Sequence, residues 1–219
     1  MKIHVVQKHV TNKDLKPFIR RAEDAGADVV CFNELATTGC LYQPQEVDSL
    51  ELVLDSLSEF DIRIMTGMPY ITEVRAYNSY LYYHHGDYQF YHKRNLFPEF
   101  GETNLYQPGK LPGVFDTDLG KLGAAICYDI RFGTVFEDLA RLKVEKVFIP
   151  AAFPKERVDQ WREMVINRAL EMHVPVVGIN PVGNDGTIEF GGVSLVVDGN
   201  GKVLAEADQN SETVLEVTL

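Results

Sequence analysis

The sequence predicts an α/β fold in which two mixed β-sheets pack face to face and helices cover their outer faces. Short runs of consecutive apolar residues alternate with segments of helical apolar spacing, which is the pattern of βαβ units with buried parallel strands. Between residues 77 and 91, two strands with alternating apolar residues flank His85-Gly86-Asp87, which is a hairpin signal. A plain doubly wound sheet does not need such a hairpin, so the mixture favours an α-β-β-α sandwich.

The N-terminal part of the chain has the pattern of one βαβ unit. Residues 2–7 form the first expected strand, and Thr11 or Asn12 can cap a helix that ends near Gly26. The apolar run 29–32 is the next strand, covered on both faces. The same signals predict later helices over 47–60, 134–143 and 157–172, and later strands over 62–65, 122–127, 146–150, 174–179, 191–197, 202–206 and 213–217.

The segment that follows Leu96 and extends to Pro112 is expected to be a long loop. It has several prolines and glycines and little periodicity, and a loop of this length in a compact domain is usually functional or disordered. Its aromatic residues argue against disorder; they are Phe97, Phe100 and Tyr106. We therefore expect the loop to contribute to function.

Length and composition favour a single domain over residues 1–219. No apolar run approaches the roughly 18 residues that span a bilayer, and the N-terminus lacks the apolar core of a secretory signal. A net charge of −11 argues against nucleic-acid and anionic-membrane partners, so a small-molecule partner is expected. The cysteines, at 31, 40 and 127, form no C-x-x-C pair. We expect a cytoplasmic protein with reduced thiols and no structural zinc.

Three ionisable residues stand at the ends of expected strands: Glu34, Lys93 and Cys127. Cys127 lies between a strand and a helical segment, where backbone N–H groups and the helix dipole favour a thiolate. A glutamate can accept the thiol proton and return it to a leaving amine, and a lysine can stabilise a developing oxyanion. Taken alone, each residue has an ordinary alternative: Cys127 as a buried apolar side chain, and Glu34 as a solvated or helix-capping one.

Motifs around these residues extend the pattern. They are Phe32-Asn33-Glu34-Leu35 with Thr37-Thr38-Gly39, Asn78-Ser79 with Gly86 and Tyr91-His92-Lys93-Arg94-Asn95-Leu96, and Gly123 to Phe132. With further landmarks in the same order over 150–154, 168–171, 177–180 and 192–194, the sequence resembles the nitrilase, or carbon–nitrogen hydrolase, superfamily. The resemblance implies its Glu-Lys-Cys triad and sandwich fold, no cofactor, no metal, and a homodimer or higher homo-oligomer.

The resemblance also implies a second glutamate in the loop after the lysine. Glu102 is favoured by its spacing to Gly109, and Glu99 is the competing candidate. By the same analogy, the Tyr128 backbone N–H contributes to the oxyanion hole, and Phe153 and Arg131 belong to the substrate pocket. Arg131 can meet a substrate carboxylate, or alternatively form a structural ion pair.

The run from Cys127 to Phe132 looks most like the ω-amidase and deaminated-glutathione-amidase branch. This implies hydrolysis of a small carboxamide through a cysteine thioester, releasing ammonia and a carboxylic acid. Nitrilase and N-carbamoyl amino acid hydrolase activities are alternatives, and a papain-type Cys-His hydrolase finds no support in the histidine pattern. A non-catalytic binding or scaffold protein would be favoured by a missing triad member, and none is missing. An enzyme should react fastest with thiol reagents at Cys127, and slowly at Cys31 and Cys40.

Overall fold

The computed structural model describes residues 1–39, 47–99 and 101–219, and within them the strands form two mixed sheets and one short ribbon. The first sheet has the order β14-β1-β2-β3-β4-β5, and the second has the order β13-β12-β9-β8-β7-β6. Strands β1, β2 and β3 run parallel, as do β7, β8 and β9, while hairpins extend both sheets. The predicted mixture of parallel units and antiparallel hairpins is confirmed.

The strands and helices have the following bounds. The strands are β1 (Lys2–Gln7), β2 (Val29–Cys31), β3 (Arg63–Ile71), β4 (Ala76–His84), β5 (Asp87–His92), β6 (Gly113–Thr117), β7 (Gly120–Ala124), β8 (Lys146–Pro150), β9 (Val176–Ile179), β10 (Val182–Asn184), β11 (Glu189–Gly191), β12 (Leu195–Val197), β13 (Val203–Glu206) and β14 (Thr213–Thr218). The helices are α1 (Lys16–Asp24), α2 (Leu50–Leu57), α3 (Glu102–Leu105), α4 (Gly133–Arg141) and α5 (Val158–Met172), with 3₁₀-helices η1 (Cys127–Arg131) and η2 (Lys155–Arg157).

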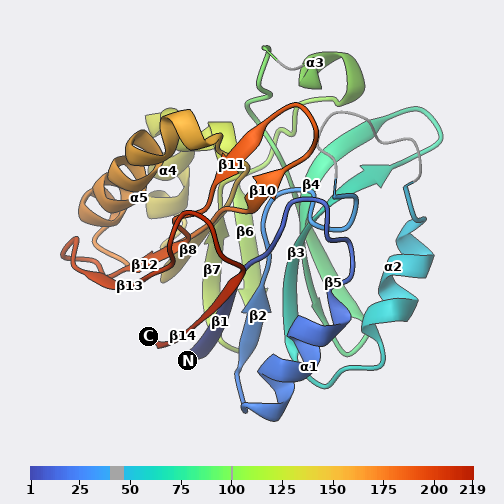
Figure 1. The fold of residues 1–219 in the computed structure, drawn as a ribbon, viewed down its shortest axis with the longest axis horizontal. Coiled ribbons are helices and arrows are strands. Elements are labelled where there is room, and N and C mark those ends of the chain that lie inside the picture. Colours follow the sequence, from blue (N-terminus) through green and yellow to red (C-terminus); the bar gives the residue numbers. More distant parts are fainter. Residues whose placement is uncertain (40–46, 100) are drawn as a thin grey trace.

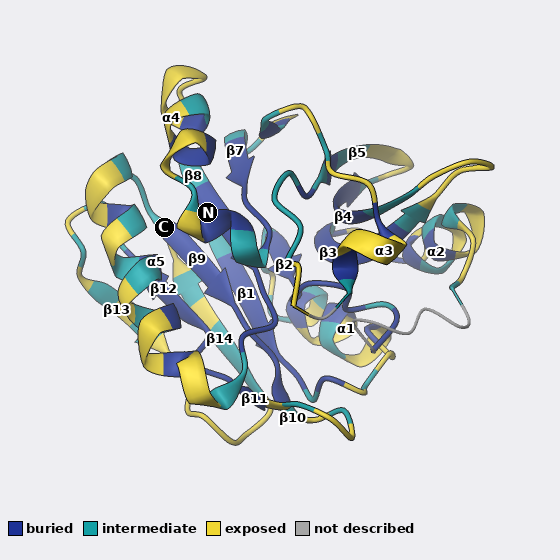
Figure 2. Ribbon diagram, turned by 90° about the horizontal axis from the view of Figure 1, so that it is seen from above, coloured by how far each residue is buried: buried dark blue, intermediate teal, exposed yellow. Residues whose placement is uncertain are grey.

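The two sheets pack face to face, with α1 and α2 outside the first sheet and α4 and α5 outside the second (Figure 1). Successive residues of one strand face opposite layers, because side chains alternate along a strand. Val5 and Cys31 pack between the sheets, whereas Val6 and Val30 pack toward α1 and α2. Figure 2 shows the strands as largely buried and the helices as exposed on their outward sides. Burial on both faces explains the uninterrupted apolar runs of the central strands.

Helices α1 and α2 begin later than the sequence signals predicted. Helix α1 starts at Lys16, and neither Thr11 nor Asn12 caps it. Pro17 suits the first turn, because its φ is fixed and its missing N–H would have no partner within the helix. Helix α2 starts at Leu50 instead of residue 47, because Ser49 is its N-cap and accepts a hydrogen bond from the Leu52 N–H at 3.3 Å.

Six short elements were not predicted, the 3₁₀-helices η1 and η2 among them. Strand β6 pairs with β7, α3 lies inside the expected long loop, and β10 and β11 form the ribbon. The predicted strand over 122–127 instead runs from Gly120 to Ala124. Elements of three to five residues are too short for a hydrophobic period to be visible. None of the helices in the described ranges could cross a membrane.

Candidate active site

Glu34 stands in a tight turn directly after β2. The next residue, Leu35, has a φ of 48°, which turns the chain away from the sheet. Strand β3 passes so close to this turn that only glycine fits at position 67, where a Cβ would come within 2.3 Å of the Leu35 nitrogen. The Gly67 N–H donates to the Asn33 carbonyl oxygen at 3.2 Å. The neighbouring strand therefore holds the Glu34 backbone in place.

Lys93 lies between two buried glutamates. Its Nζ donates to Glu34 Oε1 at 2.8 Å and to Glu102 Oε1 and Oε2 at 2.9 and 2.8 Å. The Asn78 Nδ2 donates to the Oε1 atoms of both glutamates at 2.7 Å. All four residues are 3 % exposed or less. Two carboxylates beside one ammonium leave the group with net negative charge, held together by charge-assisted hydrogen bonds.

The two loop glutamates lie in different places. Glu102 starts α3, points at Lys93, and its Oε2 accepts a hydrogen bond from the Phe97 N–H at 2.6 Å. Glu99 is exposed and forms an ion pair with Arg157 at 3.3 Å. The structure thus brings Glu102, and not Glu99, against the expected triad. Phe100, another residue of this loop, and Cys40 lie outside the described residues.

Cys127 is the first residue of η1 and has a φ of 44°, an uncommon backbone conformation for a residue with a side chain. The elbow therefore exists, but a 3₁₀-helix follows the cysteine directly and α4 begins only at Gly133. The residue is partly buried, and its sulfur is within hydrogen-bonding reach of the Ala152 backbone. Cys31, in contrast, is fully buried, and its thiol donates to the His4 carbonyl oxygen.

The electrostatics of the site differ from the sequence expectation at one point. Burial, reinforced by the Glu34 carboxylate, raises the pKa of the Cys127 thiol well above its ordinary value, against the opposing effects of Lys93 and the Ala152 N–H. Desolvation therefore opposes the thiolate that the backbone N–H groups and the helix dipole were expected to favour. Burial also raises the pKa of Glu34, with Lys93 opposing and Glu102 reinforcing the shift. A carboxylate of raised basicity thus lies near a protonated thiol, which suits proton transfer between them.

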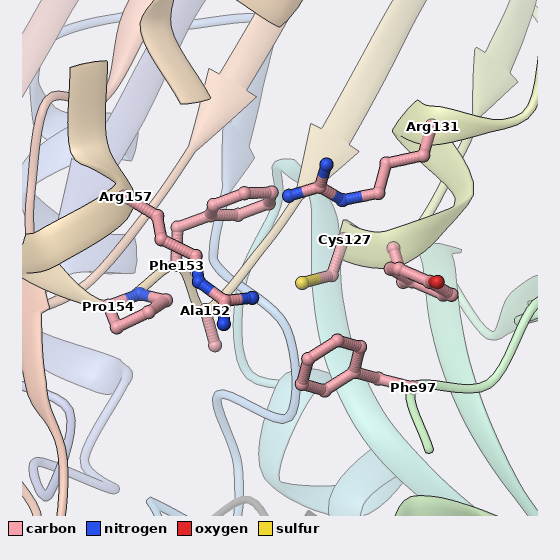
Figure 3. Close-up of a pocket in the computed structure, with 8 residues that line it drawn as sticks. Phe97, Cys127, Arg131, Ala152, Phe153, Pro154 and Arg157 are labelled. Atoms are coloured by element: carbon pink, nitrogen blue, oxygen red, sulfur yellow. The ribbon is translucent and has the colours of Figure 1, made fainter. Parts of the chain in front are cut away.

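A pocket opens directly above Cys127 (Figure 3). Aromatic side chains form much of its wall, and two guanidinium groups, those of Arg131 and Arg157, point into it from η1 and η2. Its lining residues are Phe97, Cys127, Tyr128, Arg131, Ala152, Phe153, Pro154 and Arg157. The aromatic part of the wall is apolar, and the two charged side chains that line the pocket, Arg131 and Arg157, are both cations. This combination suits a small ligand with an anionic end.

Arg131 is fixed by neutral contacts. Its Nη2 donates to Gln160 Oε1 at 2.7 Å, and its guanidinium carbon lies 5.9 Å from the ring centres of both Tyr128 and Phe153. Within the described residues it forms no ion pair with an acid, so the structural ion pair considered from the sequence is absent there. The charge of Arg131 is therefore available to the pocket.

Sequence reasoning assigned no role to three residues that shape the site. Asn78 was visible only as part of a motif, and Arg157 carries no motif at all. Asn180 holds the loop of Phe153, because its Oδ1 accepts from the Phe153 N–H at 2.7 Å and its Nδ2 donates to the Gly192 carbonyl at 2.7 Å. Its place at the end of a predicted strand, like that of Glu34, was the available signal.

No group of potential metal ligands lies at this pocket in the described residues. The one such cluster consists of Asp61, His84 and His85, at the opposite end of β4 from Asn78. Burial and the charge of Arg63 lower the pKa of His84, and the same positive charge opposes a bound cation.

Comparison with known proteins shows which family the chain belongs to. The sequence profile described as carbon-nitrogen hydrolase matches residues 6–219. A 2-oxoglutaramate amidase of Paenarthrobacter nicotinovorans is 36% identical over 54% of this chain and 42% of its own length. A 2-oxoglutaramate amidase of Bacillus subtilis is 29% identical over 90% of this chain and 80% of its own.

The fold is shared with solved structures as well. The crystal structure of Nit3 from Saccharomyces cerevisiae, a member of branch 10 of the nitrilase superfamily, has a TM-score of 0.85 at 24% identity. The match covers 99% of this chain and 89% of that one. This likeness concerns the fold, whereas the sequence profile spans nearly the whole chain. The chain therefore belongs to the carbon–nitrogen hydrolase family.

Proposed function

We propose that this protein is an amidase that hydrolyses the terminal carboxamide of a small carboxylic acid to ammonia and a second carboxylate. The observation that carries the proposal is the pocket above Cys127, in which Arg131 has no acidic partner among the described residues and which lies beside a buried Glu34-Lys93-Glu102 group. Two relatives are named 2-oxoglutaramate amidase, and their alignments cover 42% and 80% of their lengths.

The reaction begins with proton transfer from the Cys127 thiol to Glu34 as the sulfur attacks the carboxamide carbon. The ammonium of Lys93 and the backbone N–H of Tyr128, in the first turn of η1, stabilise the oxyanion that forms. Glu34 then returns the proton to the amide nitrogen, ammonia leaves, and a thioester remains. Water attacks the thioester, Glu34 accepts a water proton, and this proton returns to the sulfur as the C–S bond breaks. Glu102 positions Lys93 throughout.

The distal carboxylate of the substrate binds Arg131, with Arg157 as a second cation across the pocket. Arg131 is oriented in advance by Gln160, which lowers the cost of immobilising it on binding. Among the described residues, the Arg157 guanidinium pairs with the exposed Glu99, and such surface pairs are worth about 0–1 kcal/mol. A substrate carboxylate can therefore replace Glu99 as its partner. Nitriles and N-carbamoyl compounds that lack a distal carboxylate gain no binding energy from these two arginines.

The test compares, by ammonia release, two amides of the same chain length that differ in their distal group, a carboxylate in glutaramate and a methyl group in pentanamide. We expect kcat/KM to favour the carboxylate-bearing amide by about 10-fold or more, and Arg131→Gln to raise its KM by a similar factor while the neutral amide is unaffected. Arg162→Gln is the matched control, because this arginine pairs with Glu206 on the outer side of α5. Equal kcat/KM for both amides, or faster release of ammonia from nitriles, would reject the proposal.

The acid limb of the pH profile should identify the base. Ionised Glu34 is required, and its pKa is raised by burial and further by the Glu102 charge, so activity should fall as the pH drops toward this raised value. In Glu102→Gln that negative charge is gone, the pKa of Glu34 decreases, and the acid limb of kcat/KM should move to lower pH. Glu99→Gln, a change at the surface, should leave the limb in place. An upward or absent shift in Glu102→Gln would show that another group titrates.

We also propose that the protein works in the cytoplasm as a homo-oligomer. A reducing compartment suits a mechanism that needs the free thiol of Cys127. The outer layer of the second sheet carries partly exposed leucines, Leu142, Leu170 and Leu204, on α4, α5 and β13 or directly beside them. Sedimentation velocity of the purified protein measures the assembly, and a monomer at micromolar concentration would contradict it.

A further inference from the structure

We infer that Asp129 is a positioning residue, whose buried carboxylate sets the place of Cys127 relative to Lys93. The inference rests on the proposed function for its kinetic readout only. Asp129 is fully buried in η1, two residues after the nucleophile, and its carboxylate joins two chain segments that are far apart in sequence. One segment is the Cys127 turn, and the other is the end of β5 with the residues that follow it, including Lys93.

On the near side, Asp129 closes the turn around Cys127. Its Oδ2 accepts from the Ile126 N–H at 3.0 Å, and its own N–H donates to the Ile126 carbonyl oxygen at 2.9 Å. These two bonds span Cys127, whose φ of 44° is an unfavourable conformation for a residue with a Cβ. Such a conformation persists only where the surroundings enforce it. The reciprocal pair with Ile126 supplies that constraint.

On the far side, the same carboxylate holds the segment that carries Lys93. The Tyr91 hydroxyl donates to Oδ2 at 2.7 Å, and the backbone N–H and the Nδ2 of Asn95 donate to Oδ1 at 2.8 Å each. Lys93 lies midway between these two anchors in sequence. The distance between the nucleophile turn and the ammonium is therefore determined by bonds that meet at one buried side chain. A misplacement of about 1 Å in such a constellation can cost about 10²-fold in rate.

The chemistry of the contacts requires a carboxylate at this position. Each of its two oxygens accepts from a backbone N–H, that of Ile126 or that of Asn95, and a backbone N–H cannot turn round to accept. An asparagine has one carbonyl oxygen and one amino group, so either rotamer would place its amino group against one of these donors. Asp129→Asn thus loses at least one anchor although its size is preserved. Tyr91→Phe removes only the hydroxyl donor and keeps the charge.

The experiment compares Asp129→Asn, Tyr91→Phe and the control Asp138→Asn, whose carboxylate pairs with Arg94 near the same loop. The readouts are kcat, KM, thermal unfolding, and the pH midpoint of Cys127 alkylation by iodoacetamide, located by mass spectrometry. We expect Asp129→Asn to lower kcat about 10²-fold with KM changed less than about 3-fold. The alkylation midpoint should move to lower pH, toward that of an ordinary thiol, because the cysteine leaves its buried place beside Glu34.

Tyr91→Phe should change kcat and the midpoint in the same directions but less, and Asp138→Asn should change neither. Because Tyr91→Phe retains the Asp129 charge, its shift would report position and not the loss of a negative charge. If both variants lower only the unfolding temperature, with kcat and the alkylation midpoint as in the wild type, Asp129 is merely structural and the inference is wrong. If Asp129→Asn does not fold, the kcat and the alkylation midpoint of Tyr91→Phe alone decide whether the inference holds. If the wild type releases no ammonia from any amide, the proposed function fails, while the alkylation comparison still tests the role of Asp129.

Discussion

Cys127→Ala should abolish amide hydrolysis while leaving the fold in place. Loss of the attacking sulfur removes the only step that forms the thioester, and loss of a nucleophile costs on the order of 10⁴-fold or more in kcat. The stability cost should be small, about 1 kcal/mol, because the residue is partly exposed in the pocket and only one sulfur atom is removed. Ammonia release under saturating substrate and thermal unfolding measure the two quantities.

The control for this variant is Cys31→Ala. Cys31 is buried between the sheets and its thiol contacts only the protein interior, so its replacement should reduce stability and leave kcat unchanged. Burial raises the pKa of the Cys31 thiol as well, so iodoacetamide should react with Cys127 first, through the pocket. An alanine variant at 127 that turns over at the wild-type rate would end the assignment of this residue as nucleophile.

Lys93→Met should lose most activity and much stability together. The ammonium is 1 % exposed and pairs with two carboxylates at 2.8 Å, and removal of one partner from a buried ion pair costs about 3–5 kcal/mol. The oxyanion also loses its nearby positive charge, which should lower kcat by about 10²–10³-fold. Lys93→Arg should be damaging too, because a planar guanidinium does not fit a place shaped for a compact ammonium.

A second substitution separates these two effects. Lys93→Met with Glu102→Gln restores the net charge of the buried group, since one negative charge is removed with the positive one. The unfolding temperature should recover in large part, whereas kcat should stay low. If the double variant recovers activity along with stability, Lys93 acts through folding and has no electrostatic role in the reaction.

Much of the fold was accessible from local pattern. The central strands are buried on both faces, so their apolar runs stand out, and α4 and α5 show their helical period clearly. The beginning of α1 was misplaced because Thr11 and Asn12 are good capping residues that here serve turns of their own, such as the one in which Asn12 Oδ1 accepts from the Asp14 N–H. Strand β6 was missed because its five residues become a strand only by pairing with β7.

The site residues also divide into those that a local sequence pattern reveals and those that only the packed structure reveals. Glu34, Lys93 and Cys127 were recognisable because each follows a strand and belongs to a motif. Asn78 could not be assigned, because its bridging of two glutamates depends on the register of β4 against its neighbours. Arg157 reaches the pocket from η2, a helix too short to predict, so no pattern in the sequence connects it to Cys127.

By itself, the sequence determined the sandwich of α/β units, the family, and the chemical kinds of group that meet at the strand ends, because these depend on residue type and local period. Only the tertiary structure decided which loop glutamate reaches Lys93, since Glu102 and Glu99 are three residues apart and α3 turns just one of them inward. It also decided the surroundings that raise the pKa of the Cys127 thiol, because the desolvation of the sulfur and its exposure to the Glu34 charge arise only when both sheets have packed.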